Sequence, residues 1–429
     1  MKTAAKILAL LSVSFCLVSC GGRQSPYKDG TSYDISFKQD GSVKATLHKI
    51  TGGFNLTVTG SGRTRSFDTT SDVPWHYISK RIIDLKINEG ITVLGNSLFY
   101  SLENVKGTIL PSTVVAIGRD AFNDDAELYS VSTTEVDNGC NATIYIYKED
   151  MPEQEDVYWH YKNGVPTVWS TVKVFFIGNS FTYYYDIPMI VEGMAKSLGE
   201  MIDVDYVVKG ATSLKTHSDH NSESGQKIYN ALMSTDDYDY VVMQEQSTVP
   251  VSSYDNFKTG ATNLANDVKN SQKHAKVRLY STWGTEEAAS AQQMTIPQYE
   301  KAVRDAYIKL ANEVANIDDV HFVGPAFTQI YEGDYDFPLY YTDNRHPSMY
   351  GSYLSACIHV LSIFKDINID ATDFYGTKPG QYISQNDPTA QAPVDFGAGI
   401  SEEHAKTLIS IAKETVATYS IDTDDTTPD

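Results

Sequence analysis

The stretch VKVFFIGNSFTYYYDIP (residues 172–188) decides the fold of the larger part of this chain. It begins with a continuous apolar run that is typical of a strand buried on both faces, and such strands occur in parallel sheets covered by helices. A short polar turn and an aromatic-rich helix start follow. The turn places a lone serine, Ser180, at the carboxyl end of the strand, where sites in parallel sheets lie.

The alternation of strand and helix continues beyond this stretch. Apolar strands are predicted in IDVDYVVKG, YDYVVMQE, KVRLYSTW and DVHFVGPA, with amphipathic helices between them. The pattern predicts an α/β domain with a parallel sheet that is covered on both faces. We place this domain at residues 170–420, and an acidic tail follows at residues 421–429.

Ser180 has two interpretations. Backbone N–H groups at a helix start are unpaired, and they suit the negative oxygen that develops when a serine attacks a carbonyl group. In this interpretation Ser180 is a nucleophile. Alternatively, Ser180 or Asn179 is an ordinary N-cap of the helix, a role that needs no chemistry.

A serine nucleophile needs a base, and the base needs a carboxylate that orients it. Of the ten histidines, His346 has the most suitable surroundings, within YYTDNRHPSMYGSYLSA. Pro347 suits the first position of a helix, so His346 occupies the loop before it. Asp343 lies three residues earlier, close enough in a turn to hold the imidazole. By spacing alone, a helix-capping segment is the commoner explanation of D-x-x-H.

Four separated blocks together resemble the SGNH, or GDSL-like, hydrolase superfamily. They are GNSFT after the first strand, a glycine after the second, a polar cluster after the third and DNRHPS before a late helix, all between Val172 and Phe364. The resemblance implies a flavodoxin-like, three-layer αβα domain that hydrolyses esters and needs neither a metal nor a cofactor. It also implies that Ser180 is the nucleophile and that Asp343 and His346 are the other catalytic residues.

The resemblance further implies an oxyanion hole made of the N–H groups of Ser180 and Gly210 and of one side-chain amide. The third block departs from the G-x-N-D pattern of many members, because this chain reads VVMQEQS. We assign the amide to Gln244 and keep Gln246 as the alternative. Asn179 replaces the aspartate that is common beside the serine in this family.

Further side chains near the carboxyl ends of the strands are expected to contact the substrate: Asn179, Gln246, His217 and Trp283. His217 lies in KTHSDHNSES, where a metal pair with His220 is the alternative, but the spacing matches no established set of ligands. The ring of Trp283 can stack on the face of a sugar, with ordinary packing as the alternative.

The N-terminus, MKTAAKILALLSVSFCLVSC, predicts a secretory signal peptide, because two lysines precede an apolar run too short to span a bilayer comfortably. Its end resembles a bacterial lipobox, which implies that residues 1–19 are removed and that Cys20 carries a lipid anchor. An ordinary signal peptide with an incidental cysteine is the alternative. Residues 20–32 would form a tether. We therefore expect an exported protein that a lipid anchors in the bacterial cell envelope. Its location is either periplasmic or at the outer membrane, and the sequence leaves open which face of the membrane it occupies.

A repeat marks the region from residue 33 to residue 165. INEGITVLGNSLFYSLENVKGT and LPSTVVAIGRDAFNDDAELYSV match at one constant offset, which pairs Gly95 with Gly118 and Phe99 with Phe122. The pattern resembles the bacterial surface-antigen type of leucine-rich repeat. Two visible repeats are fewer than the roughly three that stability usually needs, so the strand-rich segment before them is expected to cap the stack. Such a domain either binds a partner, which the sequence does not identify, or acts as a spacer, the interpretation that we favour.

The composition narrows the range of partners. The formal charge is −21, and it becomes −23 without Lys2 and Lys6 of the signal peptide. So acidic a surface repels phosphate backbones and argues against nucleic acid as a partner. Besides Cys20, only Cys140 and Cys357 would remain, in separate predicted domains, so neither a disulfide framework nor a cysteine metal site is expected.

The sequence therefore predicts an exported, lipid-anchored serine esterase of SGNH type, with an acetylated carbohydrate as its substrate. The main alternative is a weak or inactive hydrolase fold that acts as a glycan-binding or adhesion module. A lipase for long acyl chains would need a broad apolar lid, which the sequence does not show.

Overall fold

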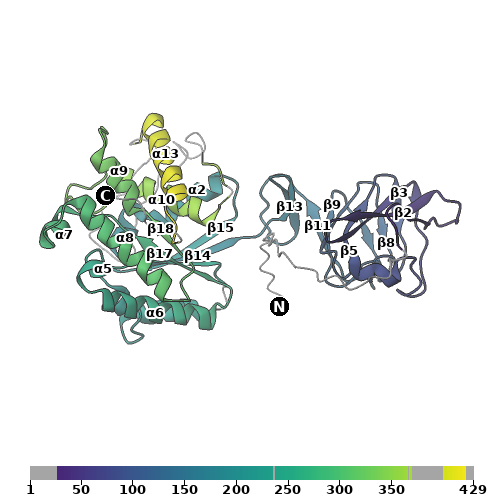
Figure 1. The fold of residues 1–429 in the computed structure, drawn as a ribbon, viewed down its shortest axis with the longest axis horizontal. Coiled ribbons are helices and arrows are strands. Elements are labelled where there is room, and N and C mark those ends of the chain that lie inside the picture. Colours follow the sequence, from purple (N-terminus) through teal and green to yellow (C-terminus); the bar gives the residue numbers. More distant parts are fainter. Residues whose placement is uncertain (1–26, 235–236, 366, 370–399, 422–429) are drawn as a thin grey trace, which may run out of the picture. The chain divides into compact units, whose positions relative to one another are not determined.

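The computed structural model describes residues 27–234, 237–365, 367–369 and 400–421, and the chain divides into two compact units, residues 1–170 and 171–429 (Figure 1). The predicted signal peptide, Cys20 and residues 422–429 of the tail lie outside the described residues. Cys140 and Cys357 are buried free thiols, one in each unit. No helix among the described residues is both long and apolar enough to cross a membrane.

The second unit is built on a five-stranded parallel sheet. Its strands are β14 (Val172–Gly178), β15 (Ile202–Val208), β16 (Tyr240–Met243), β17 (Lys276–Ser281) and β18 (Asp319–Phe322). They lie in the order β15-β14-β16-β17-β18, and every neighbouring pair is parallel. In chain order this is 2-1-3-4-5, the order of flavodoxin-like sheets. The predicted α/β fold with a parallel sheet is confirmed.

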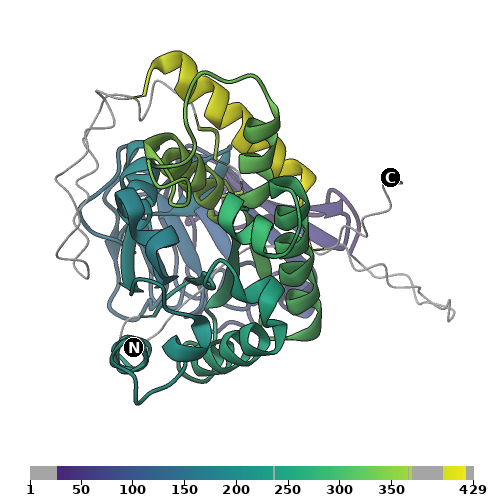
Figure 2. The same cartoon turned by 90° about the vertical axis from the view of Figure 1, so that its left-hand side faces the viewer.

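Helices cover both faces of this sheet. Successive side chains of a strand point to opposite faces, and the apolar residues of β14 therefore contribute to a core on each side. Phe176 of β14 packs in one core with α2 (Ile187–Ser197), α9 (Gly324–Glu332), α10 (Met349–Ile363) and α13 (Glu402–Thr418). Phe175, its neighbour, packs in the other core with α4 (Glu223–Leu232), α6 (Tyr254–Ser271) and α8 (Ile296–Glu313). Figures 1 and 2 show α13 and α6 on opposite sides of the sheet.

Short helices follow the carboxyl ends of the strands. They are α1 (Ser180–Tyr183) and η2 (Tyr184–Asp186) after β14, α3 (Leu214–His217) after β15, α5 (Val249–Ser252) after β16 and α7 (Glu286–Ala291) after β17. These turns lie at the edge of the sheet where sites in such folds occur.

The start of α10 corrects one detail of the sequence analysis. The helix begins at Met349, and the hydroxyl of Ser348 accepts the N–H of Tyr350 at 3.1 Å. A serine in this position satisfies a backbone donor that the helix leaves unpaired. Pro347 is therefore not the first helical residue, but His346 still lies in the loop before the helix.

The first unit consists mainly of three sheets. One sheet contains β1 (Ser32–Asp34), β2 (Val43–Ile50), β3 (Gly53–Gly60) and β5 (Ile82–Ile87), and η1 (His76–Arg81) precedes β5. The second contains β4 (Gly62–Arg63), β6 (Ile91–Leu94), β8 (Ala116–Ile117) and β10 (Glu135–Val136). The third contains β7 (Gly107–Leu110), β9 (Glu127–Ser130), β11 (Thr143–Tyr147), β12 (Tyr158–Lys162) and β13 (Val165–Val168).

The second of these sheets carries the repeat. Leu94 of β6 pairs in parallel with Ile117 of β8, and these two residues occupy the same position of the repeat. The side chain of Asn96 accepts the N–H of Arg119, and these two residues are separated in the sequence by the same number of residues. The outer strand pairs of this sheet join residues at other sequence separations. The separation is longer between β4 and β6 and shorter between β8 and β10. Because these turns of the stack differ in length, the sequence shows a regular period only in the middle of the stack.

Candidate active site

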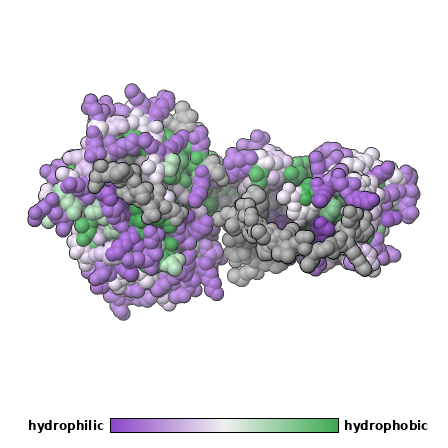
Figure 3. Space-filling model, in the orientation of Figure 1, coloured by the Kyte–Doolittle hydropathy of each residue, from purple (hydrophilic) through white to green (hydrophobic). Residues whose placement is uncertain are grey.

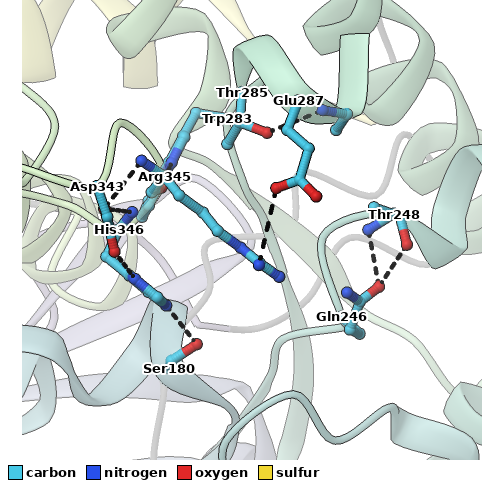
Figure 4. Close-up of polar contacts among 10 residues, drawn as sticks. Ser180, Gln246, Thr248, Trp283, Thr285, Glu287, Asp343, Arg345 and His346 are labelled. Carbon is cyan, nitrogen blue, oxygen red and sulfur yellow. Dashed lines mark hydrogen bonds and ion pairs between the residues drawn. The ribbon is translucent and has the colours of Figure 1, made fainter. Parts of the chain in front are cut away.

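Three side chains form a continuous hydrogen-bonded chain at the carboxyl end of β14. Ser180 Oγ lies 2.8 Å from His346 Nε2, and His346 Nδ1 lies 2.5 Å from Asp343 Oδ2 (Figure 4). With a proton on Nδ1, the imidazole donates to the carboxylate and accepts the serine proton through Nε2. The structure therefore brings together the three residues that the sequence analysis assigned to catalysis, although Ser180 is far from the other two in the sequence.

The loop before α10 holds the histidine by its backbone. Asp343 Oδ1 accepts the N–H groups of Arg345 and His346, both at 3.0 Å, so the same carboxylate orients both the loop and the ring. The carbonyl of His346 accepts the N–H of Tyr341 at 2.8 Å. Trp283 Nε1 donates to the carbonyl of Arg345 at 3.1 Å. These bonds tie the loop to itself and to the segment after β17.

Burial and hydrogen bonding together set the charges of His346 and Asp343. Burial lowers the pKa of His346 below its usual value of 6.5, although the Asp343 carboxylate acts in the opposite direction. Burial alone would raise the pKa of Asp343, but the hydrogen bonds from the His346 ring and from two backbone N–H groups lower it below the ordinary value. At neutral pH the imidazole is thus neutral and the carboxylate ionised. A neutral imidazole is the form that can accept a proton from serine.

Two backbone N–H groups beside Ser180 are available for an oxyanion. Gly178 and Val208 are paired at the ends of β14 and β15, and Ser180 and Gly210 each lie two residues beyond them. Among the described residues, no group accepts the N–H of Ser180 or of Gly210. Unpaired N–H groups aimed at one point stabilise a developing negative oxygen. Within the described part of the chain, both N–H groups assigned to the oxyanion hole are therefore free to donate, and they lie on neighbouring turns.

Gln244 does not have the role that the sequence analysis assigned to it. It is fully buried, and its Oε1 accepts the N–H of Asn179 and the hydroxyl of Thr182, both at 2.9 Å. Its Nε2 donates to the carbonyl of Glu245. The side chain of Gln244 thus holds the turn that carries Ser180. A β-carbon on Gly178 would overlap the Thr182 hydroxyl and lie 2.8 Å from Gln244 Oε1, which explains the glycine at this position.

Gln246, the alternative, keeps an amide donor without a partner among the described residues. Its Oε1 accepts the N–H and the hydroxyl of Thr248, both at 2.8 Å, so the orientation of the amide is fixed. No described residue accepts a hydrogen bond from its Nε2. In the view of Figure 4, Gln246 lies across the site from Ser180 and His346. The half-buried amide of Gln246 thus has a donor with no described partner, whereas that of Gln244 is occupied.

The sequence analysis missed Glu245, which organises the same edge of the sheet. It is fully buried, and its Oε1 accepts the N–H of Gln246 at 2.6 Å and that of Leu214 at 3.1 Å. Burial raises the pKa of its carboxyl group to about 7. Glu245 therefore ties the turn after β15 to the turn after β16. An acidic residue directly after an apolar strand was the sequence signal that could have identified it.

Three residues expected to touch the substrate are buried instead: Asn179, His217 and Trp283. Asn179 caps α1 by accepting the N–H of Phe181, and its Nδ2 donates to the carbonyl of Thr212. Trp283 stacks on Phe181 with the ring centroids 4.7 Å apart. These side chains pack and form hydrogen bonds within the protein beneath the site, and they are not exposed for contact with a substrate.

His217 is also a supporting residue. Its Nε2 donates to the carbonyl of Gly178 at 3.0 Å, and burial lowers its pKa to about 4. His220, its proposed partner in a metal site, pairs instead with Asp267 at 2.8 Å. In the described part of the chain, no three His, Cys, Asp or Glu side chains gather into a metal site.

A polar cavity adjoins the catalytic loop. Its volume is about 300 Å³, and it is lined by Glu286, Glu287, Ser290, Asp343, Asn344 and Arg345. The guanidinium of Arg345 extends toward Glu287 in Figure 4 and lies 3.9 Å from its carboxylate, which is 82% exposed. The lining offers both donors and acceptors of hydrogen bonds, so the cavity suits a polar ligand with several hydroxyl groups.

No protein-family model matches the chain, and no curated protein matches it. Among solved structures, a candidate SGNH hydrolase from Slackia heliotrinireducens is 23% identical over 45% of this chain and 100% of its own, with a TM-score of 0.39. A DUF4886 family protein from Bacteroides uniformis is 19% identical over 58% of this chain and 96% of its own, with a TM-score of 0.45. A family 3 carbohydrate esterase from Talaromyces cellulolyticus is 16% identical over 46% of this chain and 100% of its own, with a TM-score of 0.34.

The pKa of His346 can be measured without reference to any activity. We expect the ring to lose its proton with a midpoint below pH 6.5, because burial disfavours the charged form. The substitution Asp343→Asn should lower the midpoint further, since the carboxylate favours the protonated ring. Diethyl pyrocarbonate acylates only the deprotonated imidazole, so the pH dependence of its reaction, followed by mass spectrometry of the peptide that contains His346, gives both midpoints. A wild-type midpoint at or above 6.5, or an upward shift in the variant, would contradict this account of the site.

Proposed function

We propose that this chain is an exported, lipid-anchored serine esterase of SGNH type that removes acetyl groups from carbohydrate esters by two-step acyl transfer. The observation that carries the proposal is the hydrogen-bonded chain from Ser180 through His346 to Asp343. It lies beside two unpaired backbone N–H groups at the carboxyl edge of a parallel sheet. A nucleophile, an oriented base and an oxyanion site in this arrangement are the parts that acyl transfer needs.

The first step forms an acyl-enzyme. Ser180 Oγ bonds to the carbonyl carbon of the acetyl ester while its proton passes to His346 Nε2. The carbonyl electron pair moves onto oxygen, where the N–H groups of Ser180 and Gly210 and the amide of Gln246 donate hydrogen bonds to it. Asp343 stabilises the imidazolium. When the carbonyl reforms, the bond to the sugar oxygen breaks, and that oxygen takes the proton from Nε2 as it leaves.

The second step releases the acetate. A water molecule gives its proton to His346 Nε2 while its oxygen bonds to the acetyl carbon of the acylated Ser180. The same donors stabilise the second oxyanion. Its collapse breaks the bond to Ser180 Oγ, which recovers its proton from Nε2, and acetate leaves.

The cavity beside the triad supports a polar substrate. Carboxylate, hydroxyl, amide and guanidinium groups line it, and such groups pair with the hydroxyls of a sugar. A long acyl chain would instead need an apolar surface. On the face shown in Figure 3, hydrophobic residues of the second unit occur in small scattered groups among hydrophilic ones. These observations favour a carbohydrate ester over the ester of a long fatty acid.

The proposed nucleophile and base are tested by hydrolysis of p-nitrophenyl acetate and of acetylated sugars. We expect Ser180→Ala and His346→Ala each to lower kcat at least about 1000-fold, and the double variant to be no slower than either, because the two residues act as one unit. His220→Ala, which changes a surface histidine with its own partner, is the matched control and should keep wild-type activity. Circular dichroism verifies that each variant is folded.

A different outcome would point to a different class of protein. If the wild type hydrolyses neither p-nitrophenyl acetate nor acetylated sugars faster than its folded variants, the esterase proposal fails. The alternative of a glycan-binding or adhesion module would then be the one to pursue, by measuring binding of the same sugars.

Gln246 provides a separate test of the oxyanion hole. Gln246→Glu keeps the size of the side chain and an acceptor for Thr248, but it replaces the amide donor with a carboxylate. We expect kcat to fall about 100-fold to 1000-fold with little change in KM, because the donor acts on the transition state. Gln246→Ala should lose kcat as well. If both variants keep the wild-type kcat, Gln246 is not an oxyanion donor.

The lipid anchor rests on the sequence Leu17-Val18-Ser19-Cys20. When the full-length protein is expressed in bacteria grown with radioactive palmitate, we expect the wild type to incorporate label and Cys20→Ala to incorporate none. Equal labelling of the two proteins would refute an anchor on Cys20. The absence of label from both would favour an ordinary signal peptide.

A further inference from the structure

The ring of Tyr184 lies flat on the imidazole of His346. The ring centroids are 3.9 Å apart, and the planes are inclined by only 3°. Phe181 meets the imidazole edge-on, with the centroids 5.6 Å apart and the planes at 74°. Both aromatic residues belong to the segment that carries Ser180. One short stretch of chain thus supplies the proposed nucleophile and two of the rings that surround its base.

Contacts from both sides hold Tyr184 in this position. Its carbonyl accepts the hydroxyl of Ser352 at 3.4 Å, and Ser352 belongs to α10, the helix that follows the histidine loop. Its ring meets Tyr341 of the same loop with the centroids 5.9 Å apart and the planes at 67°. Tyr183 contacts the Tyr184 ring from the nucleophile segment. The stack is therefore part of the packing between the two segments that must meet for catalysis.

The backbone after Tyr184 has an uncommon conformation. Tyr185 has φ 52° and ψ 20°, and Asp186 has φ 53° and ψ 54°, so two consecutive residues with β-carbons lie in the left-handed region. Such conformations are disfavoured, and where they persist they gather at functional sites. Here they turn the chain from η2 into α2 immediately after Tyr184. The fold accepts this conformation at the place where the aromatic ring must lie against the histidine.

We infer that Tyr184 is a positioning residue, which holds the imidazole of His346 in the plane that joins Ser180 to Asp343 and shields one face of that ring from water. The inference rests on the proposed function. During acyl transfer the imidazole must keep a bond on each nitrogen, at 2.8 Å and 2.5 Å, while a proton enters and leaves. Tilting the ring would weaken both bonds. A parallel ring in contact with one face resists that tilt.

The same geometry argues against a different role for Tyr184, a platform for a sugar ring. A sugar stacks on the open face of an aromatic ring. One face of Tyr184 is already occupied by the imidazole, at a centroid distance of 3.9 Å. The ring therefore acts on the base and not on a substrate from that side.

The test compares two substitutions at this position. Tyr184→Phe keeps the flat ring and removes only the hydroxyl, whereas Tyr184→Leu keeps apolar bulk and removes the ring. Stacked rings contribute energies that correspond to about 2-fold to 12-fold in rate, so we expect kcat of Tyr184→Leu for p-nitrophenyl acetate to fall within that range while KM stays unchanged. Tyr184→Phe should match the wild type. Thermal unfolding verifies that both variants are folded.

A second measurement separates this inference from the proposed function. Because the ring shields His346, diethyl pyrocarbonate should acylate His346 several-fold faster in Tyr184→Leu than in the wild type or Tyr184→Phe, as read by mass spectrometry at one pH. This result does not depend on any esterase activity. Wild-type values of both kcat and acylation rate in Tyr184→Leu would overturn the inference. A loss of kcat in Tyr184→Phe equal to that in Tyr184→Leu would also overturn it, since the hydroxyl and not the ring would then be responsible.

Discussion

Parallel pairing of β14 with β15 on one side and β16 on the other holds three chain segments at one edge of the sheet. Each strand ends there, so the turn with Ser180, the turn with Gly210 and the turn with Gln246 are adjacent although they are far apart in the sequence. In this 2-1-3-4-5 sheet the strand order reverses between β14 and β16, and the crevice outside the carboxyl ends at such a point is where ligands bind in these folds. The histidine loop before α10 completes the group.

Buried polar side chains hold these turns together from within the domain. Gln244 bonds to the turn that carries Ser180, Glu245 joins the two neighbouring turns, and His217 bonds to the carbonyl of Gly178. A buried polar group is costly unless it is paired, so the hydrogen bonds that these side chains make help to fix the turns at this edge. The residues that look most reactive in the sequence therefore include several whose role is to hold others in place.

The sequence predicted the parallel sheet, because apolar strands that alternate with amphipathic helices are a local pattern. A serine after a strand and D-x-x-H before a helix each had an ordinary capping explanation, so Ser180, Asp343 and His346 were assigned on the resemblance of four separated blocks to one superfamily. The sequence did not distinguish the roles of the two glutamine amides or of the Trp283 ring. Gln244 and Gln246 are two residues apart in one turn, and both carry the same functional group. Only their partners, Asn179 and Thr182 for one and Thr248 for the other, show which amide is occupied and which is available. Trp283 was open to either interpretation, and burial decided for packing.

Local sequence patterns determined some features of this protein, and contacts between distant segments determined others. The alternation of apolar strands and amphipathic helices and the internal repeat of the first unit could be read from the sequence by itself, because they depend on residue type and short spacing. Ser180, Asp343 and His346 could be named only because four separated blocks of the sequence together resemble one superfamily. Which of the two amides keeps a free donor, the supporting role of Glu245 and the stack of Tyr184 on His346 were decided only by the tertiary structure. The physical reason is that each depends on the direction of a side chain and on partners from distant segments, and neither is set until the strands pair and the helices pack.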